Sequence, residues 1–197
     1  MIDQELQDLI RKSTVPDPWN PRWINVESLG GGYAVEIEIA ELLHGFVRAV
    51  KPKVVVETGT HKGFSALVIA KALQQNGEGH LYTVDLEDHK VRALLDRFGV
   101  GKLVTVSNMY SAKFLKSMRA DTVVDLLWLD ADHTKEAVLE EFMAAERLLR
   151  PGSYVGFHDT IIDPREDAAV REIRRLRPSW EYVRFVSARG FDLMRVC

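Results

Sequence analysis

The stretch that decides the fold is Val54-Val55-Val56-Glu57-Thr58-Gly59-Thr60-His61-Lys62-Gly63-Phe64-Ser65. Three consecutive β-branched valines after Pro52 predict a strand that is buried on both faces. Gly59 and Gly63 predict a tight turn into a helix, because glycine has no Cβ to obstruct a close approach of the backbone. Glu57 then stands at the carboxyl end of the strand, where open α/β sheets bind their ligands.

Strands and helices alternate along the chain on both sides of this stretch. Apolar residues recur at helical spacing before it, in residues 34–50, and directly after it, in residues 64–73. The remaining pattern predicts strands at 80–85, 103–106, 123–130, 154–158, 180–186 and 191–196, with helices at 91–98, 111–118, 135–149 and 165–176. This alternation predicts an α/β fold with a doubly wound, seven-stranded, mostly parallel sheet. The tight connection between the last two strands predicts an antiparallel pair at one edge.

The first 32 residues predict a helical lid on a core formed by residues 33–197, within one domain of residues 1–197. Leu6, Leu9 and Ile10 indicate a helix from about residue 3 to residue 12. Prolines then predict an irregular segment that contains two tryptophans, Trp19 and Trp23. These tryptophans either pack the segment onto the core or line an acceptor pocket, and both interpretations stay open.

The composition excludes several classes of protein. A hydrophobic content of 46% supports a substantial core and argues against global disorder. The 26 basic and 29 acidic residues give a formal charge of -3, which disfavours a nucleic-acid partner. Cys197 is the only cysteine, so a disulfide scaffold is excluded and a cytoplasmic location is expected. No apolar run of about 18 residues occurs, so we expect no membrane partner.

Acidic residues stand at the carboxyl ends of four predicted strands, namely Glu57, Asp85, Asp130 and the pair His158-Asp159. The turn after Glu57 has the pattern Glu-x-Gly-x-x-x-Gly and lacks the Gly-x-Gly-x-x-Gly of pyrophosphate-binding turns, which favours a phosphate-poor nucleoside cofactor. Asp85 follows the glycine turn at about the spacing along the sequence at which a carboxylate after the second strand binds ribose hydroxyls. The alternative is a plain strand-to-helix turn with an aspartate on the surface.

With these residues the sequence resembles the class I S-adenosylmethionine-dependent methyltransferases, in the branch of small O-methyltransferases that includes the catechol, caffeoyl-CoA and macrolide-sugar enzymes. The resemblance runs from about Gly32 to Val196 and is carried by Val55-Val56-Glu57-Thr58-Gly59-Thr60-His61-Lys62-Gly63-Phe64-Ser65, Thr83-Val84-Asp85, Asp125-Leu126-Leu127-Trp128-Leu129-Asp130-Ala131-Asp132-His133 and Leu148-Leu149-Arg150-Pro151-Gly152. It implies a Rossmann-like fold that binds the methionine moiety near the glycine turn, the ribose on Asp85 and the adenine in the loop after the third strand. The implied cofactor-binding residues are Glu57, Gly59, Thr60, Gly63, Ser65, Asp85, Asn108, Met109, Tyr110, Ser111 and Asp130.

The resemblance also implies where the chemistry occurs. His133 matches the position from which such enzymes deprotonate the acceptor hydroxyl, with Asp130 as the second catalytic residue, and an imidazole suits this role because its pKa lies near neutral pH. The alternative for His133 is a cap on the following helix. Metal-dependent relatives bind a divalent ion, Mg or Mn, through residues that correspond to Asp130, His158 and Asp159. A hydrogen-bonded cluster without a metal remains the other interpretation.

We therefore expect S-adenosylmethionine-dependent methyl transfer to an oxygen of a small hydroxylated acceptor. One rival hypothesis is a nicotinamide-dependent oxidoreductase, which the missing glycine pattern disfavours. Another is a non-catalytic nucleoside-binding domain, suggested by His158 at a position where relatives usually have an acid. A homodimer is one option for the assembly.

Overall fold

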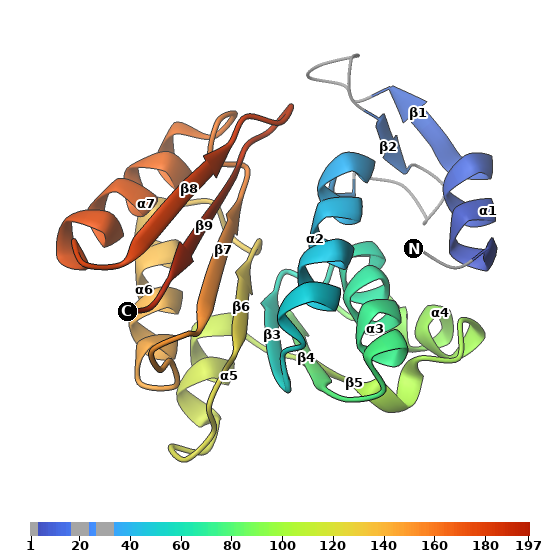
Figure 1. Cartoon of the computed structure of the whole chain (residues 1–197), viewed down its shortest axis with the longest axis horizontal. Coiled ribbons are helices and arrows are strands. Elements are labelled where there is room, and N and C mark those ends of the chain that lie inside the picture. The colour runs from blue at the N-terminus through green and yellow to red at the C-terminus, as the bar shows by residue number, and fades with distance from the viewer. Residues whose placement is uncertain (1–3, 17–23, 27–33) are drawn as a thin grey trace.

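A seven-stranded sheet forms the centre of the protein, in a computed structural model that describes residues 4–16, 24–26 and 34–197 (Figure 1). Its strand order is β5-β4-β3-β6-β7-β9-β8. The strands are β3 (Val54–Thr58), β4 (His80–Asp85), β5 (Val104–Asn108), β6 (Leu126–Leu129), β7 (Tyr154–His158), β8 (Glu181–Phe185) and β9 (Phe191–Arg195). Strands β3 to β7 are parallel, and β9 runs antiparallel to both β7 and β8. The predicted fold class, including its antiparallel edge, is confirmed.

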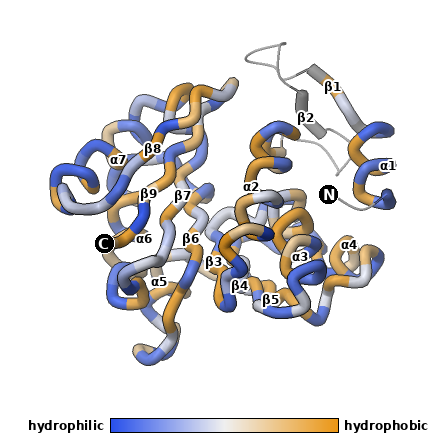
Figure 2. The backbone as a smooth tube through the Cα atoms, in the orientation of Figure 1, coloured by the Kyte–Doolittle hydropathy of each residue, from blue (hydrophilic) through white to orange (hydrophobic). Residues whose placement is uncertain are grey.

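Helices cover both faces of the sheet, and each face has its own hydrophobic core (Figure 1). One face carries α2 (Ile37–Val50), α3 (Phe64–Asn76) and α4 (Val91–Arg97). The other carries α5 (Ser111–Ser117), α6 (Lys135–Glu146) and α7 (Pro164–Leu176). A short 3-10 helix, η1 (Gly101–Leu103), leads into β5. Figure 2 shows hydrophobic segments along α2 and α3, which pack on the sheet, and hydrophilic stretches on the outer helix α7.

The strand order reverses between the neighbouring strands β3 and β6, because the chain returns from β5 at one edge to add β6 beside β3. β3 pairs with β4 on one side and with β6 on the other. The carboxylate of Asp125, just before β6, accepts hydrogen bonds from the backbone N–H groups of Lys53 and Val54 at 2.7 and 2.9 Å. This contact sets the register at the start of both strands, and the crevice at their carboxyl ends is the place where α/β sheets bind ligands.

The amino-terminal part differs from the prediction in one respect. The predicted helix is present as α1 (Gln4–Ser13), but it is followed by a small antiparallel pair, β1 (Thr14–Pro16) and β2 (Ile24–Val26), where an irregular segment was expected. Proline is tolerated in an isolated two-stranded pair because each strand has a free edge. Trp19 and Trp23 lie outside the described residues. Among the described helices, none combines the length and the apolar character needed to cross a membrane.

Candidate active site

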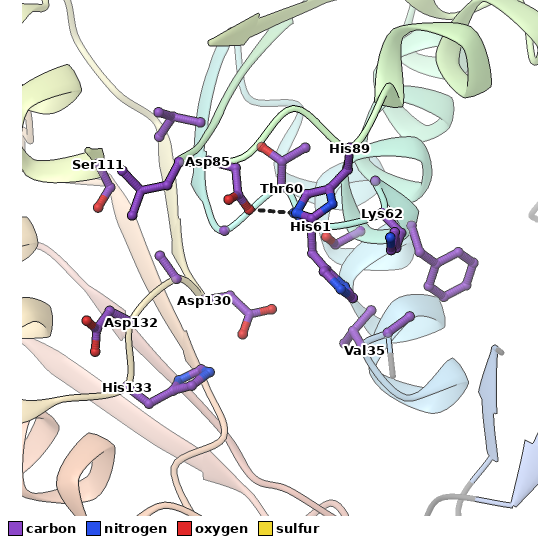
Figure 3. Close-up of a pocket in the computed structure, with 18 of the residues that line it drawn as sticks. Val35, Thr60, His61, Lys62, Asp85, His89, Ser111, Asp130, Asp132 and His133 are labelled. Carbon is purple, nitrogen blue, oxygen red and sulfur yellow. Dashed lines mark hydrogen bonds between the residues drawn. The ribbon is translucent and has the colours of Figure 1, made fainter. Parts of the chain in front are cut away.

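A pocket of about 350 Å³ opens at the carboxyl edge of the sheet, across the ends of β3, β4, β6 and β7 (Figure 3). Eleven of the residues singled out in the sequence line it. These are Gly59, Thr60, Gly63, Ser65, Asp85, Met109, Tyr110, Ser111, Asp130, His133 and Asp159. The lining residues that the sequence analysis did not select are Ala34, Val35, His61, Lys62, Phe64, Val84, Leu86, His89, Ala131, Asp132 and Arg189. Three selected residues, Glu57, Asn108 and His158, do not line it.

The glycine turn brings the ends of β3 and β6 into direct contact. Gly59 has a φ of +85°, and a Cβ placed there would lie 1.9 Å from the backbone oxygen of Asp130. The N–H of Gly59 donates to the carbonyl of Val84 at 2.9 Å, which ties the turn to β4 as well. Glycine is therefore required at this position for two reasons, its backbone conformation and the close approach of Asp130.

Glu57 lies beneath the pocket and is fully buried. Its Oε2 accepts a hydrogen bond from the Thr83 hydroxyl at 2.5 Å, and the hydroxyls of Thr83 and Thr60 are 2.6 Å apart. Burial raises the pKa of Glu57 to about 8, so the side chain is mostly protonated at neutral pH. In this structure Glu57 supports the pocket residue Thr60 from below, whereas the sequence analysis placed it against the cofactor.

Asp85 holds the turn at the end of β4. Its Oδ2 accepts the backbone N–H of His61 at 2.8 Å (Figure 3), and its Oδ1 accepts that of Glu87 at 3.1 Å. His61 has a φ of +43°, and its ring meets that of His89 edge to face at 5.3 Å. Both histidines line the pocket.

The loop after β5 forms the wall next to Asp85. The N–H of Met109 donates to the carbonyl of Asp85 at 2.9 Å, and Met109, Tyr110 and Ser111 all line the pocket. Asn108 is exposed, and its side chain donates to the carbonyl of Glu87 at 2.9 Å. Asn108 therefore secures the loop from outside in this structure.

At the other end of the pocket, Asp130, His133 and Asp159 converge, with one potential ligand atom from each lying within 4.8 Å of the others. Figure 3 shows Asp130 and His133 pointing toward the same open space. Nε2 of His133 is 3.4 Å from Asp159 Oδ2, and Nδ1 is 3.4 Å from Glu166 Oε2. The cap of helix α6 is Thr134, whose hydroxyl accepts from the N–H of Ala137, so the capping role considered for His133 belongs to its neighbour.

Four ionisable groups set the charge of this end. Burial lowers the pKa of His133, but the hydrogen bond to Glu166 and the nearby charges of Asp130 and Asp159 raise it to about 9. Burial raises the pKa of Glu166 to about 7. In this environment His133 carries a proton at neutral pH, and the entry of a positive charge among the carboxylates would make that proton easier to lose.

His158 does not line the pocket and is 1% exposed. Its Nε2 is 2.7 Å from Glu36 Oε2, and its Nδ1 is 3.3 Å from both Asp130 Oδ1 and Asp159 Oδ1. Burial opposes protonation, but the carboxylates of Asp130 and Asp159 raise the pKa of His158 well above its usual value. Since both ring nitrogens face carboxylates, this imidazole acts as a buried cation, and the set that converges on one point contains His133 in place of the predicted His158.

The residues present fit a divalent ion. One potential ligand atom each from Asp130, His133 and Asp159 lies within 4.8 Å of the others. Within the described part of the chain, the adjacent Glu166 Oε1 is buried without a hydrogen bond, whereas Asp159 Oδ1 already lies 3.3 Å from His158 Nδ1. Two carboxylates with one imidazole are a donor set that suits manganese or another first-row ion better than magnesium. The composition of the cluster thus favours Mn over Mg among the two predicted ions.

Two charged residues that the sequence analysis missed complete the site. Glu36, at the start of α2, is fully buried and accepts hydrogen bonds from the Ser187 hydroxyl at 3.1 Å and from the Arg189 N–H at 2.9 Å. The Arg189 guanidinium donates to the carbonyl of Ala34 at 2.7 Å and lies 3.9 Å from Asp159 Oδ1. The β8–β9 connection thereby closes one side of the pocket.

Comparison with known proteins adds independent information. Residues 56–160 match a family model described as "Methyltransferase domain". Caffeoyl-CoA O-methyltransferase 2 from Zea mays is 22% identical over 157 residues, which cover 77% of this chain and 54% of that protein. The chain thus spans about half the length of this curated relative.

Solved structures are similar over the whole chain. The O-methyltransferase TomG from Streptomyces achromogenes, solved in complex with SAM, superposes with a TM-score of 0.72 at 23% identity and covers 100% of this chain and 91% of that chain. An O-methyltransferase from Bacillus cereus in complex with SAH gives a TM-score of 0.70 at 18% identity, covering 100% and 92%. At these identities the superpositions establish a shared fold.

Proposed function

This chain belongs to the methyltransferase family whose model matches its residues 56–160, and we propose that it transfers the methyl group of S-adenosylmethionine to an oxygen of a small hydroxylated molecule. The observation that carries this proposal is the single pocket that joins Asp85 at one end to Asp130, His133 and Asp159 at the other. A nucleoside bound at the first end would present its reactive group to an acceptor held at the second.

The cofactor would lie between the glycine turn and the loop of residues 109–111, with its ribose hydroxyls on Asp85. Backbone contacts fix both walls, because the N–H groups of Gly59 and Met109 each donate to a carbonyl of β4, at Val84 and Asp85. Such preorganisation lowers the cost of ordering the site when the ligand binds.

Methyl transfer needs a nucleophilic oxygen, so the acceptor hydroxyl must lose its proton. We infer that Nε2 of His133 takes this proton, while Glu166 fixes the ring through Nδ1. The imidazole must first be neutral, and the positive sulfonium of the cofactor would promote this by lowering the pKa of His133. Asp130 would orient the acceptor oxygen at the same point.

We further propose that a divalent ion assists the methyl transfer. Asp130, His133 and Asp159 would hold it, and a bound ion would polarise the acceptor oxygen. In that case His133 would be a ligand, because one nitrogen lone pair cannot bind an ion and accept a proton at the same time. Chelation separates the two roles: full turnover after treatment with EDTA would leave His133 as the base, and loss of turnover that manganese restores would make it a ligand.

The whole proposal is tested by calorimetry with S-adenosylmethionine and by transfer of a labelled methyl group to a panel of hydroxylated compounds. We expect binding and transfer, and a protein that binds no S-adenosylmethionine would overturn the proposal. NADH titration followed by fluorescence tests the oxidoreductase alternative in parallel. Cofactor binding without transfer to any compound, with or without manganese, would instead indicate a non-catalytic domain.

A further inference from the structure

Glu141 is a buried carboxylate that the chemistry proposed above does not use. It projects from the middle of α6 and is 1% exposed. Its Oε2 accepts a hydrogen bond from the Thr58 hydroxyl at 2.8 Å, and its Oε1 accepts one from the Ser111 hydroxyl. Thr58 is the last residue of β3, directly before the glycine turn, and Ser111 lines the pocket on the opposite wall.

A carboxylate at this position is costly to the fold. Its buried neighbours on α6 are apolar or small, namely Ala137, Val138, Phe142, Ala144 and Ala145. Burial raises the pKa of Glu141, while the two hydroxyl donors act in the opposite direction. An apolar side chain would pack α6 on the sheet without this penalty, so packing alone does not account for the acid.

One partner of Glu141, Ser111, lines the cofactor pocket, and the other, Thr58, directly precedes the lining residue Gly59. We propose that Glu141 is a positioning residue for the cofactor, which holds the glycine turn through Thr58 and the loop of residues 109–111 through Ser111 at a fixed separation. This inference rests on the proposed S-adenosylmethionine site. The carboxylate acts from the α6 face of the sheet, and the backbone bonds to β4 act beside it, so the two sets of contacts together hold each wall.

The test measures cofactor affinity by calorimetry, and it needs no acceptor. Glutamine at position 141 is neutral and offers one oxygen and one amide NH2, so in Glu141→Gln one of the two hydroxyls must accept a hydrogen bond instead of donating one, and neither bond is assisted by a charge. We expect about tenfold weaker binding of S-adenosylmethionine, equivalent to one charged hydrogen bond. Thr58→Val removes the other hydroxyl at a residue that does not line the pocket, and it should weaken binding to a similar extent. The matched control is Glu136→Gln, an exposed acid on the same helix, which should bind within about twofold of wild type.

A second ligand tests the contact through Ser111 separately. 5′-Methylthioadenosine contains the nucleoside but lacks the amino acid moiety, so its affinity for Glu141→Gln should also fall, through the loop of residues 109–111. Once an acceptor is known, the KM for S-adenosylmethionine should rise, while kcat and the KM for the acceptor stay at wild-type values. Circular dichroism at the assay temperature verifies that each variant is folded, and Thr58→Val decides the matter if the Glu141 variant is not.

The failure of this inference differs from failure of the proposed function. If wild-type protein does not bind S-adenosylmethionine, the proposed function falls. If wild-type protein binds and folded Glu141→Gln and Thr58→Val bind equally well, only the positioning role is overturned. Weaker binding of S-adenosylmethionine with unchanged binding of 5′-methylthioadenosine would overturn it too, since the loop of residues 109–111 would then be unaffected.

Discussion

Replacing Glu36 with glutamine is expected to lower the free energy of unfolding by about 3 kcal/mol at pH 7. The hydrogen bonds from His158, Ser187 and Arg189 all end on this one carboxylate. Burial raises the pKa of Glu36, but the contact with His158 and the backbone donors outweigh it and lower the pKa from 4.5 to about 2. A shift of that size corresponds to about 3 kcal/mol, in agreement with the cost of breaking a buried ion pair.

The sign of the pH dependence follows from the lowered pKa. The folded state releases the proton of Glu36 more readily than the unfolded state, so the stabilisation is complete above pH 4.5 and declines as the pH falls toward 2. About 2 kcal/mol of it should be lost by pH 3. The difference in stability between wild type and Glu36→Gln should therefore shrink from about 3 kcal/mol at pH 7 to about 1 kcal/mol at pH 3.

Urea unfolding followed by far-ultraviolet circular dichroism measures this difference at both pH values. Glu41→Gln is the matched control, because Glu41 is an exposed acid on the same helix, and its effect should be within about 0.5 kcal/mol. A difference for Glu36→Gln below about 1 kcal/mol at pH 7, or one that does not narrow in acid, would refute the reasoning.

Three further predictions concern the pocket. Gly59→Ala should lower the free energy of unfolding by about 2–4 kcal/mol, because of the positive φ and the overlap of the new Cβ with Asp130. Gly77 has a similar φ of +77° but open space around it, so Gly77→Ala should lower the free energy of unfolding, measured in urea, by only about 1 kcal/mol. Equal effects would contradict the steric argument. Glu57→Gln should gain stability relative to wild type as the pH rises from 5 to 8, by up to about 1.4 kcal/mol per pH unit. The raised pKa of Glu57 makes the folded wild type hold a proton that the unfolded chain releases. Parallel stability–pH profiles for the two proteins would exclude a buried neutral acid. If His133 is the base, kcat/KM for S-adenosylmethionine, measured with chelator-treated enzyme, should rise with pH toward the pKa of about 9 in the free enzyme. His133→Asn should lack that rise while still binding the cofactor.

Much of the fold follows from local patterns in the sequence. The bounds predicted for β4 and β7 agree with the structure, because each strand is a short run between clear breaks. The predicted strand at 123–130 is shorter in the structure, since Asp125 turns its carboxylate to the start of β3 and Val124 bonds to Leu148. Such end effects depend on partners from elsewhere in the chain, and no local pattern contains them.

The candidate site also contains residues that local sequence patterns predict and residues that they do not. Asp85, Asp130 and Asp159 could be selected because parallel strands place their carboxyl ends at one edge, and the structure brings all three to one pocket. Arg189 could not be selected, because it enters the pocket from a hairpin and contacts residues 155 positions earlier in the chain. The orientation of His158 could not be predicted either, because it depends on Glu36, which precedes it by 122 residues in the sequence. An acid inside an amphipathic pattern looks like a solvated residue until its distant partner is known.

The distance along the chain between Glu36 and its partners has a consequence for biosynthesis. A ribosome makes Glu36 long before Ser187 and Arg189, which follow it by 151 and 153 residues. A nascent chain that has formed only the parallel strands lacks both donors, so burying Glu36 at that stage would leave its Oε1 without them. We therefore expect the first turn of α2 to dock last, after the β8–β9 hairpin has emerged, and a stalled chain lacking that hairpin to expose this turn to proteases and chaperones.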